Sequence, residues 1–107
     1  LKRVVLPATV TAIEEAAFAN CRALETIDTE NARSIGKWVF ENCVSLRNLR
    51  IGEKMETIYD SAFMNCTALG TINIPGSVQT LGRWLFEGCE NLETITLNEG
   101  VRNLSPI

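Results

Sequence analysis

The sequence contains no histidine among its 107 residues. Histidine is the commonest general base near neutral pH and the most frequent metal ligand, so its absence removes the usual centre of both kinds of site. There is also no glycine-rich phosphate-binding loop, and no serine has a candidate base at a suggestive spacing. We therefore predict no catalytic residue, no cofactor and no metal, and a protein that is not an enzyme.

An excess of charge of one sign is also missing. Ten basic and 13 acidic residues leave a formal net charge of −3. This balance gives no electrostatic reason to expect binding to nucleic acid or to an anionic membrane. No apolar run is long enough to span a bilayer, and the first residues do not form a signal-peptide pattern.

A regular repeat is the most informative feature that is present. Each phenylalanine is followed three residues later by a cysteine, which gives the pairs Phe18 and Cys21, Phe40 and Cys43, Phe63 and Cys66, and Phe86 and Cys89. Successive pairs are 22, 23 and 23 residues apart. A fixed period in this range is typical of a solenoid, in which each repeat forms one coil and the coils stack.

Apolar residues recur at further fixed positions of the unit. Three residues after the cysteines stand Leu24, Leu46, Leu69 and Leu92, and three further on stand Ile27, Leu49, Ile72 and Ile95. The next two columns contain Thr29, Ile51, Ile74 and Leu97, and then Ile13, Ile35, Ile58, Leu81 and Leu104. Alternation of apolar and polar residues predicts a short strand with one buried face at the second and third columns. A single helical or 3-10 turn is expected around each phenylalanine.

The repeated motifs resemble a known family. The segments I-E-E-A-A-F-A-N-C, I-G-K-W-V-F-E-N-C, I-Y-D-S-A-F-M-N-C and L-G-R-W-L-F-E-G-C, each followed by x-x-L-x-x-[IL], are similar to the BspA-like class of leucine-rich repeats, whose unit is about 23 residues long. The resemblance implies an α/β fold: a right-handed solenoid with a parallel strand ladder and short helical or 3-10 turns. Known members are mostly surface or secreted proteins linked to adhesion, so it also implies an extracellular or cell-surface location, with the cytoplasm as the alternative.

The whole chain is predicted to be a single array of about four and a half coils. We divide it at residues 1–23, 24–45, 46–68, 69–91 and 92–107. Neither end carries the polar cap that covers the terminal coils of a solenoid. We expect the chain to be an excerpt of a longer protein, with a tendency to associate end to end through exposed apolar columns.

The four cysteines are expected to be buried free thiols. Stacked coils would place the Cα atoms of successive cysteines about 5 Å apart, in a line of parallel vectors. Zinc requires ligands that converge tetrahedrally, and a disulfide requires Cβ vectors that face each other. A line of cysteines supplies neither, so we interpret them as small apolar core residues.

The outward positions of the strands form the candidate binding surface. The first outward column contains Arg3, Thr26, Asn48, Thr71 and Thr94, and the second contains Val5, Asp28, Arg50, Asn73 and Thr96. If the strands line a docking face, both columns contact the partner. A stabilising ladder of threonine and asparagine explains the first column equally well. The second column has the more varied chemistry and is the better candidate for contact.

Two tryptophans form a second candidate. Trp38 and Trp84 occupy one column in alternate units. Exposed indoles are favoured at interfaces, so the pair is a candidate for partner binding. An amphipathic side chain that covers the outer turn is the alternative interpretation, and the sequence favours it.

The sequence predicts a non-catalytic binding or adhesion scaffold that engages a protein or a glycan through its strand face. A purely structural spacer or self-association module is the main alternative. A less favoured alternative is a non-catalytic part of an enzyme whose chemistry lies outside this chain. We expect no nucleic-acid partner and no membrane span in this segment.

Overall fold

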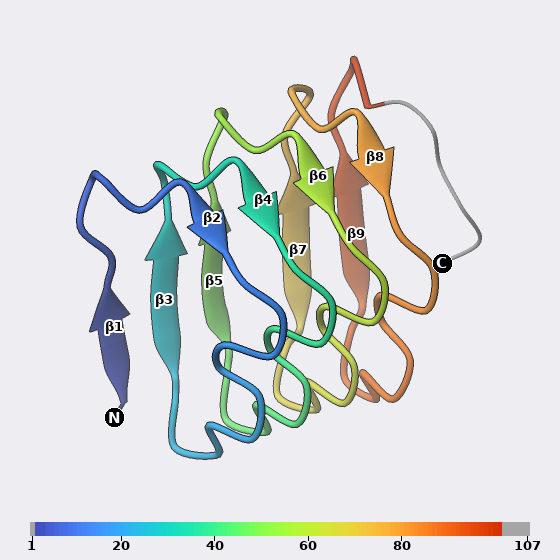
Figure 1. Cartoon of the computed structure of the whole chain (residues 1–107). Helices are drawn as coiled ribbons and strands as arrows, with labels where there is room; N and C mark the ends of the chain where they lie inside the picture. The colour runs from blue at the N-terminus through green and yellow to red at the C-terminus, as the bar shows by residue number, and fades with distance from the viewer. Residues whose placement is uncertain (1, 102–107) are drawn as a thin grey trace.

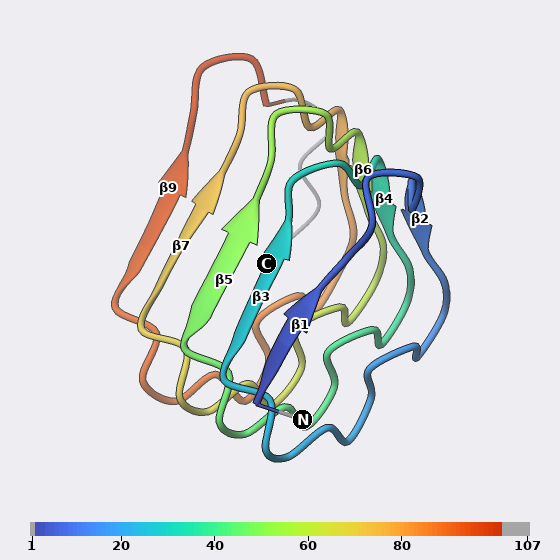
Figure 2. The ribbon, with the colours of Figure 1, turned by 90° about the vertical axis from the view of Figure 1, so that its left-hand side faces the viewer.

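The computed structural model describes residues 2–101 as a stack of flattened coils with a strand ladder on each of two opposite sides (Figure 1). The longer strands are β1 (Arg3–Val5), β3 (Thr26–Thr29), β5 (Asn48–Ile51), β7 (Thr71–Ile74) and β9 (Thr94–Leu97). The shorter strands are β2 (Ala12–Ile13), β4 (Ser34–Ile35), β6 (Thr57–Ile58) and β8 (Thr80–Leu81). Seen along the stack, each coil passes from a long strand to a short strand and returns through a winding turn segment (Figure 2).

Strand pairing is parallel and advances by one predicted repeat at each step. Ile27 pairs with Leu49 in the long-strand ladder, and Ile58 pairs with Leu81 in the short-strand ladder. The predicted solenoid of about four stacked coils is therefore confirmed. The units predicted at 1–23 and 92–107, and the column position at residue 104, extend outside the described residues. The unit boundaries stay predictions.

The core consists of the columns that the spacing predicted. The described strands β3 and β7 alternate between buried and outward residues, with Ile27, Ile72 and Ile74 inside. The phenylalanine rings stack along the array, with neighbouring centroids 5.6 to 5.9 Å apart and interplanar angles of 5° to 8°. Each buried ring contributes about 1.5–3 kcal/mol by leaving water. That burial requires neighbouring coils, because Phe40 and Phe63 are each covered by a copy above and a copy below.

Thr29 is the polar exception in a buried column. Its side chain is fully buried, and its hydroxyl donates a hydrogen bond of 2.8 Å to the backbone carbonyl of Arg50 in the next coil. A buried hydroxyl is tolerated when it is paired in this way. Threonine in place of an aliphatic residue at this position therefore adds a hydrogen bond between coils.

The segments around the phenylalanines are not helices, so the helical or 3-10 part of the predicted α/β fold is wrong for the described residues. The N–H of Ala19 closes a tight turn with the carbonyl of Ala16 (3.0 Å), whereas the N–H of Phe18 donates to the carbonyl of Val39 in the next coil (3.0 Å). The φ angles of Ala16 and Asn20 are +57° and +64°. Two left-handed residues four positions apart interrupt any right-handed helix, and alternate N–H groups bond to the neighbouring coil instead.

An asparagine ladder runs along these turns. The amide of Asn42 donates to the side-chain oxygen of Asn20 (2.9 Å), and the amide of Asn65 donates to that of Asn42 (3.0 Å). All three have φ angles between +60° and +64°, a region that asparagine tolerates better than most residues. Gly88, with φ +77°, takes the fourth position, where a Cβ atom would lie only 1.9 Å from Oδ1 of Asn65. The ladder of asparagine side chains therefore does not continue through Gly88.

Candidate binding surface

The outward strand positions are exposed as predicted. Exposed side chains include Asp28, Asn48, Arg50, Thr71, Asn73, Thr94 and Thr96, whereas Thr26 is half-buried. The register places Thr26 beside Asn48 and Asp28 beside Arg50. It likewise places Thr71 beside Thr94 and Asn73 beside Thr96. The structure therefore brings the predicted residues together in two groups, one on β3 and β5 and one on β7 and β9.

The long-strand ladder is interrupted between these two groups. β1, β3 and β5 form one sheet and β7 and β9 another, whereas the short strands from β2 to β8 form a continuous ladder. One backbone hydrogen bond between β5 and β7 cannot form because the residue that would donate it is a proline. The N–H of Asn98 donates to the carbonyl of Ile74 (3.0 Å), but Pro75, at the equivalent position one coil earlier, has no N–H to donate. The predicted face is thus divided at the middle of the array.

A charged cluster lies beside the interruption. Nη1 of Arg50 lies 3.2 Å from Oδ1 of Asp28 and 2.5 Å from Oε1 of Glu30. Its hydrogen bond to Glu30, and then the charge of Asp28, raise the pKa of the Arg50 guanidinium above its ordinary value. All three side chains remain more than half exposed. Exposed ion pairs contribute at most about 1 kcal/mol each, so a partner can exchange these contacts at little cost.

Clefts open on both sides of Arg50. One, of about 310 Å³, is lined by Arg50 together with Glu53, Asn73 and Asn98. A second, also of about 310 Å³, is lined by Arg50 together with Asp28, Asn48 and Thr71. Both clefts include residues from each side of the interruption between β5 and β7. The hollowed part of the strand face therefore coincides with its charged cluster.

Glu30 is a member of the cluster that the sequence columns did not include. It lies in the turn after β3, and it hydrogen-bonds through its backbone N–H to Oδ1 of Asp28 (2.9 Å). The second unit is one residue shorter than the others between Thr29 and Ala32. That deletion is the signal that could have identified the turn as different from its counterparts.

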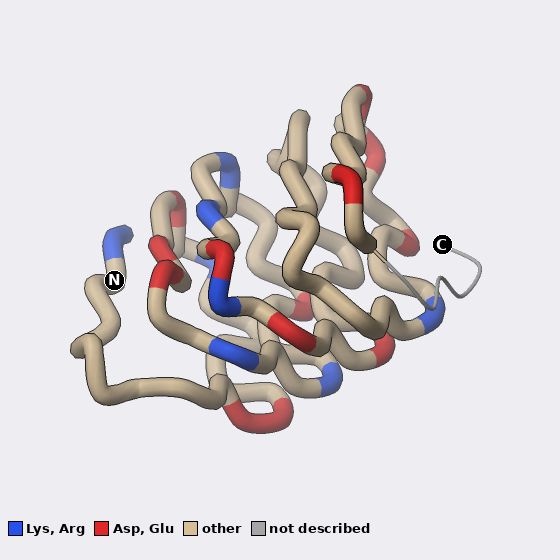
Figure 3. The backbone as a smooth tube through the Cα atoms, turned by 90° about the horizontal axis from the view of Figure 1, so that it is seen from above, with Lys and Arg blue, Asp and Glu red and all other residues tan. Residues whose placement is uncertain are grey.

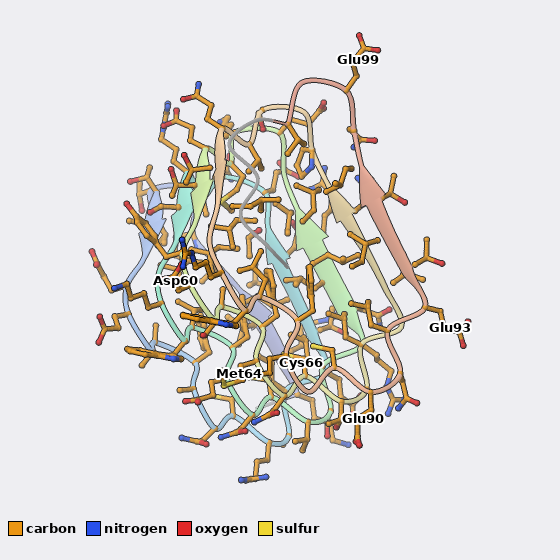
Figure 4. All side chains as sticks on the ribbon, turned by 90° about the vertical axis from the view of Figure 1, so that its right-hand side faces the viewer. Asp60, Met64, Cys66, Glu90, Glu93 and Glu99 are labelled. Carbon is orange, nitrogen blue, oxygen red and sulfur yellow. The ribbon has the colours of Figure 1, made fainter. Side chains whose placement is uncertain are left out.

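The cysteines form a line of thiols with no chemical activation. Each of the later three donates to a phenylalanine carbonyl one coil earlier, as Cys66 does to Phe40 (3.2 Å). Burial raises the pKa of the Cys43 thiol to about 11 and raises the pKa of Cys66 further. A protonated thiol is neither a nucleophile nor a metal ligand. Figure 4 shows Cys66 inside the coil, with Glu93 and Glu99 pointing away from it. The prediction of buried free cysteines is confirmed for Cys43 and Cys66.

Charge is mixed over the rest of the surface. Lysine and arginine are interspersed with aspartate and glutamate along the array (Figure 3). Within residues 2–101, no group of three or more potential ligand side chains is arranged to hold a metal ion. In the same part of the chain, no helix has the length and apolar character that a membrane crossing requires.

The two tryptophans share one column on the opposite side of the coil from the long strands. Their φ angles are +57° for Trp38 and +56° for Trp84, and Ser61 between them also has a φ of +57°. Both indoles are exposed. They are therefore not brought together with Arg50 and form a separate surface.

A parallel ladder with one coil per 22 or 23 residues, and a core of recurring leucine, isoleucine and phenylalanine, defines a leucine-rich-repeat solenoid. Residues 1–106 match a family model described as BspA type leucine rich repeat region, with 6 copies. The chain belongs to the BspA-type leucine-rich-repeat family. The comparison with curated proteins gave no match.

Solved structures of bacterial proteins are similar over most of the chain. A leucine-rich repeat protein from Bacteroides capillosus has a TM-score of 0.83 and 28% identity, over 92% of this chain and 78% of that one. One from Bacteroides ovatus has a TM-score of 0.78 and 27% identity, over 89% of this chain and 33% of that one. A leucine rich cell surface protein from Faecalibacterium prausnitzii shares the fold, with a TM-score of 0.74 and 23% identity, over 91% of this chain and 32% of that one. This chain thus spans only about a third of the latter two.

Proposed function

We propose that the chain is a non-catalytic binding scaffold that engages a macromolecular partner, a protein or a glycan, through its strand face. The observation that carries the proposal is the Arg50 cluster, which is exposed, contains charges of both signs and is flanked by two clefts. Mixed charges of this kind favour a protein, because complementary charge patterns select protein partners and steer their approach.

The contrast between inward and outward residues supports this proposal. Inward positions repeat the same residue types from coil to coil because each must pack against its own copies. The outward positions Asp28, Arg50, Asn73 and Thr96 hold a different residue at every step, first acidic, then basic, then neutral. Packing does not require this variety, whereas recognition of a partner does.

We also propose that the scaffold acts outside the cell or on its surface. Membership of the BspA-type family supports this location, because the resemblance links the family to surface and secreted proteins. Adhesion to host proteins is the activity that such a location would serve.

The test compares two folded variants with the wild type. Asp28→Ala/Arg50→Ala/Asn73→Ala alters the strand face, and Arg22→Ala/Glu87→Ala removes one charge of each sign from exposed turn positions as the matched control. Binding to a panel of purified, immobilised host extracellular proteins is measured by biolayer interferometry. For the partners that the wild type binds, the strand-face variant is expected to raise Kd at least tenfold, and the control is expected to keep it.

Two results would contradict the proposal. A folded strand-face variant with an unchanged Kd would exclude the Arg50 cluster from the interface. Equal losses in both variants would indicate an unspecific charge effect. A structural spacer, the alternative function, predicts no specific partner for any of the three proteins.

A further inference from the structure

The most exposed aromatic side chains of the described residues follow three successive short strands. Trp38, Tyr59 and Trp84 are 39%, 47% and 54% exposed, whereas every phenylalanine is buried or half-buried. We call these three residues the aromatic band. They come from three successive coils and follow the short strands β4, β6 and β8, on the side opposite to the strand face (Figure 1).

Hydrogen bonds between coils fix the geometry of the band. The N–H of Trp38 donates to the carbonyl of Asp60 (3.3 Å), and the N–H of Ser61 donates to the carbonyl of Arg83 (2.9 Å), the residue before Trp84. The two tryptophans are thus two coils apart with Ser61 between them. Two strand spacings place their backbones about 10 Å apart along the array.

Tyr59 lies in the open middle of the band. The equivalent residues in the neighbouring coils are Gly36 and Gly82, which have no side chains to cover the phenol ring on either side. The band therefore presents an indole, a phenol and a second indole in order along the array. Its three aromatic residues are exposed, whereas Ser61 between the tryptophans is buried.

The fold does not require tryptophan at these positions. Ala16 and Ser61 occupy the same column with the same φ of +57°. A left-handed backbone costs a side-chain-bearing residue about 1–2 kcal/mol, and bulky residues are rare there. The two tryptophans are 39% (Trp38) and 54% (Trp84) exposed. An indole that only covers the turn does not account for this much exposed tryptophan surface.

The charges beside the band select the class of ligand. Glu15, Lys37, Asp60 and Arg83 stand next to the tryptophan column and alternate in sign along it. Their charges cancel, and Oδ1 of Asp60 already accepts a hydrogen bond from the N–H of Arg83 (2.8 Å). A strip of this kind offers no net attraction to an anion or a cation. It suits a neutral ligand that has apolar faces and many hydroxyl groups.

We propose that the aromatic band binds a neutral glycan chain. Sugar rings present C–H faces that stack on indole and phenol rings, and their hydroxyls hydrogen-bond to charged side chains at the edge of such a stack. The backbone separation of about 10 Å between the tryptophans suits contact with two sugars of one chain. A protein partner would need about 800 Å² of surface on this side, which three aromatic residues do not supply. This site goes beyond the strand-face function and is independent of it.

The experiment is affinity electrophoresis of the 107-residue chain in native gels that contain a dissolved neutral polysaccharide. The probes are hydroxyethylcellulose, xyloglucan, dextran and yeast mannan, with polygalacturonate as the anionic comparison. We expect at least one neutral probe to retard the wild type. Trp38→Ser and Trp84→Ser are each expected to raise Kd at least tenfold, and the double variant is expected to lose retardation. Serine is chosen because the array already carries it at position 61.

Two controls separate the site from the fold and from the strand face. Asp28→Ala/Arg50→Ala/Asn73→Ala is expected to be retarded like the wild type, because it leaves the band intact. The chain contains only two tryptophans, and both belong to the band. Intrinsic fluorescence of the wild type is therefore expected to shift when the retarding polysaccharide is added, a readout that needs no variant.

The proposal is overturned if none of the neutral probes retards the wild type, or if polygalacturonate alone does. It is also overturned if folded serine variants are retarded like the wild type, or if the fluorescence does not respond. Loss of a protein partner by the serine variants, without any binding of neutral polysaccharide, would identify the band as a protein-docking surface instead.

Discussion

The segments around the phenylalanines (the turn side) and the outward face of the long strands (the strand side) differ in how regularly their residues repeat. On the turn side, phenylalanine, cysteine and asparagine recur at fixed positions. The phenylalanine rings stack on their counterparts and the asparagine amides bond to theirs, whereas the later three cysteines each donate to a phenylalanine carbonyl of the preceding coil. On the strand side, the residue of the second outward column changes at every coil, and the ladder is interrupted between β5 and β7. Repetition therefore marks the residues that hold the array together. Variation marks positions that packing between coils does not constrain.

Hydrogen bonding strengthens this contrast. Alternate N–H groups of the turns donate to the next coil, as Phe40 does to Ala62 (2.8 Å), and the short-strand ladder continues through all its strands. The turn side is thus the continuous support of the array. Substitutions on the two sides should therefore differ in their effect on stability.

Phe63→Ala should be the most destabilising of these changes. The ring is fully buried between Phe40 and Phe86, so its removal leaves a cavity in the middle of the stack. Large-to-small changes of this kind cost about 3–5 kcal/mol. Urea unfolding measures the loss, and Phe18→Ala at the half-buried end of the stack should cost less. A loss below about 1 kcal/mol would mean that the ring is not in the core.

Asn42→Ala should reduce the free energy of unfolding by about 1–3 kcal/mol. The change removes the side-chain hydrogen bonds to Asn20 and Asn65 and places alanine at a φ of +61°. Asn42→Gly removes the same bonds but relieves the backbone, so it should cost less than alanine. Equal effects of alanine and glycine in thermal unfolding would show that the left-handed backbone carries no cost.

Thr29→Val should cost about 1 kcal/mol. Valine has nearly the same shape but cannot donate the hydrogen bond that Thr29 gives to the carbonyl of Arg50. Thr94→Val, at an exposed position of the first outward column, is the matched control and should change stability by less than about 0.5 kcal/mol. A stabilised Thr29→Val variant would contradict the role given to the buried hydroxyl.

Arg50→Met should have the smallest effect on stability, at most about 1 kcal/mol, because exposed ion pairs contribute little. The loss should shrink further in high salt, since salt screens exposed charges. Denaturant unfolding at low and high salt measures both values. A loss of unfolding free energy above about 2 kcal/mol would indicate that Arg50 has a structural role.

Much of this division could be predicted from the sequence. The spacing of phenylalanine and cysteine predicts the stack, and the alternation around Ile27 and Ile72 predicts strands with outward residues. The turns were harder to predict. Residues such as Ala16 and Trp38 do not indicate a left-handed backbone by their type, so the apolar turns suggested short helices instead. The partnership of Arg50 with Glu30 depends on a shortened turn, and the interruption at Pro75 depends on a single missing N–H.

The side-chain-free position at Gly88 has a consequence for how such arrays lengthen. A duplicated unit inserted before it can carry its own asparagine, whose amide donates to the side-chain oxygen of the preceding asparagine, so the ladder continues. A unit inserted directly after it would find no side-chain oxygen to accept its amide, and its asparagine would begin unpaired. Expansion of the gene by copying repeats is therefore easier upstream of Gly88 than downstream.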